Sequence, residues 1–233
     1  MLSSAAPVFL FDVDNTLIDN DRFVADLSAR LEHDFGKAGN EHYWTIYEAL
    51  RAELGFADFL GALQRFRAGR EDAPELLQLS QFMLDYRFAD RLFPQALQAI
   101  EHVRSFGTPA ILSDGDIVFQ PRKIQCSGLW HAVQGQVLVT IHKQDALGLV
   151  QEQFPARHYV MIDDKPHLLA AMKRKLGACL TSVFVRQGHY AASARDQSIV
   201  PAPDQSVARI GDLCAQPRAF FLPTLHTRDL EAT

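Results

Sequence analysis

The 233-residue sequence has few cysteines, no long apolar run and no basic tract. Its three cysteines, Cys126, Cys179 and Cys214, are far apart and odd in number, which predicts reduced thiols in a cytoplasmic protein rather than a disulfide framework. No apolar stretch approaches the roughly 20 residues that cross a bilayer. The net charge of −5 argues against nucleic-acid binding, because that binding needs a basic surface. We therefore expect no membrane and no nucleic-acid partner.

A Cys/His zinc site is also excluded, since the nine histidines are scattered without the spacing of metal ligands. What the sequence does contain is regular apolar spacing. From about residue 19 to residue 90 this spacing is helical throughout. Asp72, followed by Pro74 and Glu75, predicts an N-cap and a helix start. Three further helices are predicted around residues 23–31, 43–54 and 56–63.

After residue 91, short apolar runs alternate with helical segments. Parallel strands joined by helices form right-handed crossovers and a sheet covered on both faces. The sequence therefore predicts an α/β fold: a Rossmann-like parallel sheet with helices on both faces, and an all-helical cap inserted after the first strand. Residues 1–18 and 91–233 would form the core, and residues 19–90 the cap. The strands are predicted at residues 8–11, 109–112, 136–141, 159–162 and 180–185, with a short final strand and helix in 200–214.

Acidic residues follow the first predicted strand directly. Its apolar run ends at Asp12, and Asp14 comes two residues later. Open α/β sheets place their chemistry at the carboxyl ends of strands. In an extended chain both side chains would point to one face, unless the loop turns sharply. Two carboxylates in that position need a cation, or one of them must stay protonated.

Polar residues also follow the later strands. Ser113, Asp114 and Gly115 come after the second, and Lys143 follows the third. Two adjacent acids end the fourth strand, which is costly unless a cation sits there. Taken together, four carboxylates against one ammonium leave three uncompensated negative charges in one cleft. Mg²⁺ fits such a cleft because it prefers hard oxygen ligands. The four acids are Asp12, Asp14, Asp163 and Asp164.

Residues 8–17 resemble motif I of the haloacid dehalogenase superfamily of aspartate-nucleophile phosphohydrolases, and the later clusters are similar to motifs II to IV, in order, over about residues 7–190. The resemblance implies a C1 cap and a two-step reaction. Asp12 would attack phosphorus, and Asp14 would protonate the leaving group and then activate water. Thr16 would orient the motif I loop. The four acids would bind Mg²⁺.

The same resemblance assigns phosphate binding to Ser113, Asp114, Gly115 and Lys143. Lys143 is followed by Gln144 where many relatives have Pro, so Lys123, or Arg122 beside it, stays open as the motif III residue. The expected function is Mg²⁺-dependent hydrolysis of a small phosphorylated metabolite by a monomer or homodimer. The alternatives are a haloacid dehalogenase, a phosphomutase or a catalytically silent phospho-ligand binding protein. A response-regulator receiver is disfavoured by the length of the chain and by the helical insertion.

Overall fold

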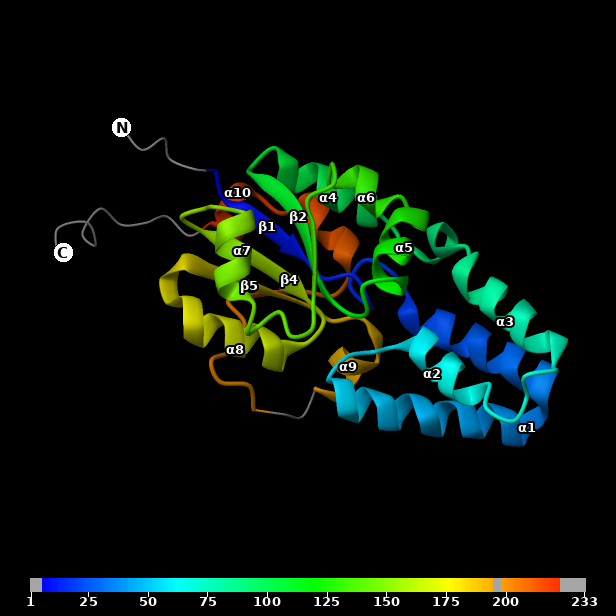
Figure 1. The fold of residues 1–233 in the computed structure, drawn as a ribbon. Helices are drawn as coiled ribbons and strands as arrows, with labels where there is room; N and C mark the ends of the chain where they lie inside the picture. Colours follow the sequence, from blue (N-terminus) through cyan, green and yellow to red (C-terminus); the bar gives the residue numbers. More distant parts are fainter. Residues whose placement is uncertain (1–5, 195–197, 223–233) are drawn as a thin grey trace.

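The computed structural model describes residues 6–194 and 198–222, and at its centre is a parallel sheet of six strands (Figure 1). The strand order is β3-β2-β1-β4-β5-β6, so β1 lies between β2 and β4. This central place explains why β1 is apolar throughout: all four of its residues are buried. The predicted α/β fold is confirmed. The strands are β1 (Val8–Phe11), β2 (Thr108–Asp114), β3 (Val137–Thr140), β4 (Tyr159–Asp163), β5 (Leu180–Val185) and β6 (Gln205–Val207).

The chain between β1 and β2 is helical, as predicted, and its first three helices extend to one side of the sheet (Figure 1). The last helix of the insertion, α4, packs on β2 instead. This insertion consists of α1 (Asn20–Leu54), α2 (Phe59–Phe66), α3 (Pro74–Leu84), the 3₁₀ helix η1 (Phe88–Arg91) and α4 (Ala96–Arg104). The later helices are α5 (Phe119–Cys126), α6 (Leu129–Ala132), α7 (Leu147–Gln153), α8 (Pro166–Leu176), η2 (Gly177–Cys179), α9 (Gly188–Ser193), η3 (Ile210–Ala215) and α10 (Arg218–Phe221).

Two details of the insertion differ from the sequence prediction. The first two predicted helices are joined as α1, which is kinked where Gly36 takes a positive φ of 70°. Glycine has no Cβ and takes this conformation without steric cost. The prediction that Asp72 caps α3 is wrong, because the N-cap is Ala73 and no side chain bonds there. Pro74 occupies the first helical turn, where a missing N–H costs nothing.

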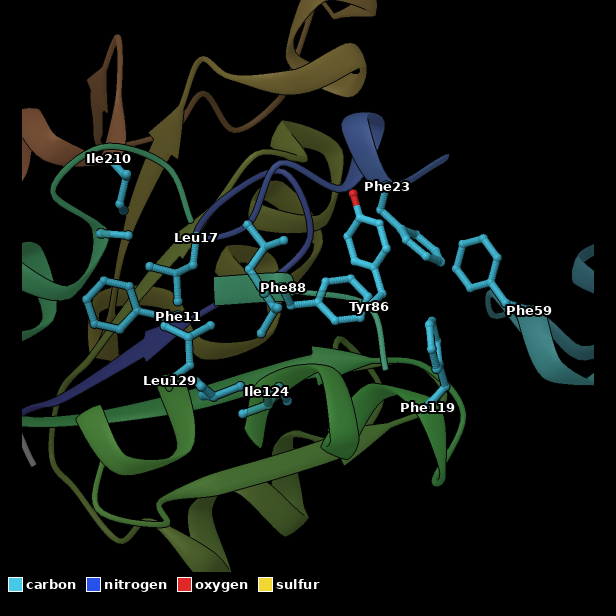
Figure 2. Packing of buried hydrophobic residues seen from close by; sticks show 14 of the residues in the cluster. Phe11, Leu17, Phe23, Phe59, Tyr86, Phe88, Phe119, Ile124, Leu129 and Ile210 are labelled. Atoms are coloured by element: carbon cyan, nitrogen blue, oxygen red, sulfur yellow. The ribbon is translucent and has the colours of Figure 1, made fainter. Parts of the chain in front are cut away.

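Apolar residues form two clusters, one on each face of the sheet. Alternate residues of β1 supply both, because successive side chains of a strand point to opposite faces. Val8 and Leu10 join the cluster under α7 and α8. Phe9 and Phe11 join a larger cluster, which continues into the helical insertion (Figure 2). Insertion and sheet therefore share one apolar core. Among the described residues, no helix is long and apolar enough to cross a membrane.

Candidate active site

Three charged side chains predicted from sequence meet at the carboxyl edge of the sheet. β1 and β4 pair with Phe11 opposite Ile162, so Asp12 and Asp163 emerge side by side. Lys143 lies on the loop after β3, and its Nζ donates hydrogen bonds to Asp12 Oδ1 and, over 2.8 Å, to Asp163 Oδ2. All three side chains are buried. The structure thus places Lys143, and not Lys123, against the predicted nucleophile.

Lys143 is held in its charged form by these neighbours. Burial alone would lower the pKa of its ammonium, but the nearby carboxylates of Asp12, Asp163 and Asp114 outweigh burial and raise it. For Asp163, burial raises the carboxyl pKa although Lys143 opposes the shift. Lys165 faces the same carboxylates: burial lowers its pKa, and Asp12 and its neighbours raise it above the ordinary value. The cluster therefore contains two ammonium groups.

Asp164 is the least satisfied group of the site. Its carboxylate is buried, and neither oxygen has a hydrogen-bond partner. Burial, followed by the charges of Asp163 and Asp12, raises the pKa of Asp164 to about 9. Ligand oxygens of Asp12, Asp163 and Asp164 lie within 4.8 Å of one another. Unpaired buried carboxylates of this kind are costly unless they coordinate a metal, so the three residues fit a divalent cation with hard oxygen ligands.

Asp14 lies apart from this acidic group because the loop after β1 turns sharply. Leu17 and Ile18 both donate their backbone N–H to Val13 O, and Asn15 takes a positive φ of 61°. The carboxylate of Asp14 instead accepts one hydrogen bond from Lys123 and one from Gln120, and it is 24% exposed. Among the described residues it is not one of the grouped acids, so its role as a metal ligand stays a prediction.

The residues predicted to bind phosphate lie at the carboxyl edge of the sheet and are connected to their neighbours by hydrogen bonds. Ser113 is buried, and its Oγ accepts from Gln120 Nε2 at 2.9 Å. The Asp114 carboxylate accepts from the backbone N–H of Lys143 at 2.7 Å, which fixes the lysine loop. Gly115 already donates its N–H to a carbonyl across the sheet edge, that of Thr140. Phosphate binding by these residues is therefore still a prediction.

Around Asp12 the motif I loop supplies one more contact. Thr16, which the sequence predicted to orient this loop, donates from its Oγ1 to Asp12 Oδ2 at 3.2 Å and so also holds the carboxylate. With Lys143 on the other oxygen, both oxygens of Asp12 are held from opposite sides. A carboxylate that is fixed in this way is already oriented to react with a group bound above it.

A cavity of about 490 Å³ opens between α1 and the carboxyl edge of the sheet, large enough for a small metabolite. Several of its lining residues were not predicted from sequence. Arg51 reaches into it from α1 and bonds the hydroxyl of Tyr190. The lining residues are brought together by packing of the helical insertion against the sheet, and local sequence patterns do not reveal such packing. Polar and aromatic residues of the lining include Asp14, Asn20, Trp44, Tyr47, Arg51, Lys165 and Tyr190.

Comparison with known proteins identifies the family. The family model of the haloacid dehalogenase-like hydrolases matches residues 6–174, and the chain belongs to this family. A Burkholderia xenovorans LB400 protein assigned to the haloacid dehalogenase-like hydrolases is 52% identical, with a TM-score of 0.86 over 94% of this chain and 99% of that chain. The sequence resemblance is thereby confirmed, and the protein is a haloacid dehalogenase-like hydrolase. Among curated proteins, none matches this chain.

Two more distant structures share the fold. L-2-haloacid dehalogenase from Xanthobacter autotrophicus is 19% identical, with a TM-score of 0.59 over 90% of this chain and 97% of that chain. The HAD-hydrolase YfnB from Bacillus subtilis, whose structure contains magnesium, gives the same identity, TM-score and coverage. At this identity the likeness extends to the fold alone.

Proposed function

We propose that this hydrolase is a Mg²⁺-dependent phosphohydrolase that acts on a small phosphorylated metabolite through an aspartyl phosphate on Asp12. The buried Asp164 carboxylate carries the proposal, because both of its oxygens lack partners and it lies beside Asp12 and Asp163. Burying an unpartnered carboxylate costs free energy in the folded state, and a bound divalent cation would offset this cost. The magnesium in YfnB is consistent with the choice of metal.

In the first step, Asp12 attacks phosphorus in line while Thr16 and Lys143 hold its two oxygens. The reacting phosphoryl group carries negative charge, and the ammonium groups of Lys143 and Lys165 supply fixed positive charge beside it. When bound, Mg²⁺ would add positive charge at the acidic group and so reduce repulsion between the carboxylates and the phosphoryl oxygens. The product of this step is the phosphorylated side chain of Asp12.

Proton transfer falls to Asp14, which lines the cavity where the leaving group would sit. It donates a proton to the leaving oxygen and then removes one from the water that hydrolyses the aspartyl phosphate. A positioned acid or base of this kind contributes typically 10²- to 10⁴-fold. The separation of Asp14 from the acidic group supports different roles for the two aspartates, with Asp12 as the nucleophile and Asp14 as the acid and base.

Hydrolysis of a carbon–halogen bond is the second candidate, given the fold shared with the Xanthobacter enzyme. A halide leaves without a proton, so that reaction needs neither an acid at position 14 nor a metal. Asp14 and the unpartnered Asp164 therefore favour phosphate esters. A phosphomutase would use the same residues and differ only in keeping water from the aspartyl phosphate, and a silent protein would bind phosphate without turnover.

The test measures phosphate release from p-nitrophenyl phosphate by wild type, by Asp12→Asn and by a control variant, Asp72→Asn. The Asp72 side chain is exposed and is not part of the candidate site. We expect activity that EDTA abolishes and Mg²⁺ restores, lost in Asp12→Asn and kept in Asp72→Asn. Full activity in EDTA, or metal-independent halide release from 2-chloropropionate, would contradict the proposal. A panel of sugar phosphates, nucleotides and phosphorylated acids then identifies the substrate.

A further inference from the structure

A second buried lysine holds Asp14, outside the acidic group. Lys123, on α5, has no exposed surface. Its Nζ donates to Asp14 Oδ1 at 2.7 Å and to Asn20 Oδ1 at 3.0 Å. Four phenyl rings surround the Nζ, with centroids 5.5–6.0 Å away: those of Phe23, Phe59, Phe88 and Phe119.

An ammonium is costly to bury unless its surroundings compensate for lost water. Here a carboxylate, an amide oxygen and aromatic faces do so, the last by cation–π attraction. Because these partners lie on several sides, Lys123 has little freedom to move. Gln120 lies one helical turn before it, on the same face of α5, and donates to the other oxygen of Asp14 at 3.3 Å. Both oxygens of Asp14 are thus fixed from α5.

The rings around Lys123 come from two parts of the molecule. Those of Phe23, Phe59 and Phe88 belong to α1, α2 and η1 of the helical insertion, whereas that of Phe119 belongs to α5. Figure 2 shows all four rings gathered on one side of the apolar cluster. The environment of Lys123 is therefore complete only while the insertion packs against the sheet domain.

From this geometry we infer that Lys123 is a positioning residue, which fixes Asp14 for proton transfer to the leaving group and makes this placement depend on the packing of the helical insertion. The inference rests on the proposed function, in which Asp14 is the acid and base. Lys123 bonds neither Asp12 nor Asp163 in the described part of the chain, so its effect on the reaction passes through Asp14.

The test replaces Lys123 by Met, a flexible apolar chain of similar length that suits an aromatic environment. The control is Lys175→Met, at an exposed lysine paired with Asp145. We compare kcat/KM for an alkyl phosphate with kcat/KM for p-nitrophenyl phosphate, whose leaving group needs little protonation. The ratio of the alkyl phosphate value to the p-nitrophenyl phosphate value should fall by about tenfold or more in Lys123→Met. In Lys175→Met this ratio should stay at the wild-type value. An equal loss for both substrates would overturn the inference.

A double-mutant cycle with Asp14→Asn tests whether Lys123 affects the reaction through Asp14. If Lys123 acts through Asp14, adding Lys123→Met to Asp14→Asn should change kcat/KM by less than about twofold. Additive losses would contradict this. Should Lys123→Met fail to fold, Phe59→Leu removes one ring of the insertion and keeps the ammonium. The ratio should again fall, by a smaller factor, and an unchanged ratio would overturn the inference.

Crystal structures of wild type and Lys123→Met provide a readout that needs no activity. We expect the Asp14 carboxylate to leave its present position and lose its contact with Gln120. An Asp14 side chain that stays in place in the variant would refute the positioning role. If the wild-type protein releases no phosphate at all, the proposed function fails, and this comparison still decides whether Lys123 positions Asp14.

Discussion

Replacing Asp164 by Asn should change how the stability of the metal-free protein depends on pH. The ordinary pKa of this carboxyl group is 3.8, and in the folded protein it is raised to about 9. Between these values the folded chain holds a proton that the unfolded chain has released. Its free energy of unfolding therefore falls as pH rises, by about 1.4 kcal/mol per pH unit. Asparagine does not titrate, so Asp164→Asn lacks this loss.

From pH 6 to pH 8 the difference amounts to about 2.7 kcal/mol. In a chain of this size, 1 kcal/mol shifts Tm by about 2–4 °C. We expect the Tm of Asp164→Asn minus that of wild type, both measured in EDTA, to rise by about 5–11 °C over this range. Thermal unfolding followed by circular dichroism at pH 6, 7 and 8 measures it, with Asp72→Asn as a control whose difference from wild type stays constant.

A difference in Tm that does not change with pH would refute the argument, because it would mean that Asp164 does not carry the extra proton. Mg²⁺ adds a second comparison. A ligand that binds only the folded state raises its free energy of unfolding by RT ln(1 + [L]/Kd), and Mg²⁺ binding here must displace the proton from Asp164. Mg²⁺ should therefore stabilise wild type more at pH 8 than at pH 6, and Asp164→Asn hardly at all. Equal stabilisation of both proteins would place the metal elsewhere.

Three other outcomes follow from the site. Lys143→Met removes the ammonium that is paired directly with buried Asp12 and Asp163, so urea denaturation should show a loss of about 3–5 kcal/mol. Gly55→Ala should cost about 1–3 kcal/mol by the same measurement, because Gly55 has a φ of 83° and a Cβ there would lie 2.5 Å from the His142 ring. Beryllium fluoride should inhibit the wild type but fail to bind Asp12→Asn in calorimetry, since it mimics phosphate on that carboxylate.

Much of the fold could be predicted because the central strands β1 and β4 are buried throughout and consist mainly of apolar residues. β1 and β5 were predicted with their observed limits, residues 8–11 and 180–185, and the other strands within a few residues. Strand order then brings Asp12, Lys143 and Asp163 together, because parallel strands present their carboxyl ends at one edge. The main part of the candidate site was therefore visible in the sequence.

The support for Asp14 could not be predicted in the same way. Gln120 and Lys123 lie three apart on a short helix, a pattern that is typical of a solvated helix face. Lys123 is covered by phenyl rings such as those of Phe23 and Phe59, which are about 100 and 60 residues earlier in the sequence. Local periodicity identifies those aromatics as apolar but says nothing about the charge that they cover.

Asp12 and Asp14 therefore lie in different environments although they are two residues apart. Asp12 faces a buried cluster with Lys143, which suits a nucleophile that must approach an anionic group. Asp14 faces a partly open cavity, where a leaving group and later a water can reach it. The turn at Asn15 produces this separation, and Lys123 and Gln120 maintain it. A carbon–halogen hydrolase would have no use for the second environment, whereas hydrolysis of a phosphate ester needs both.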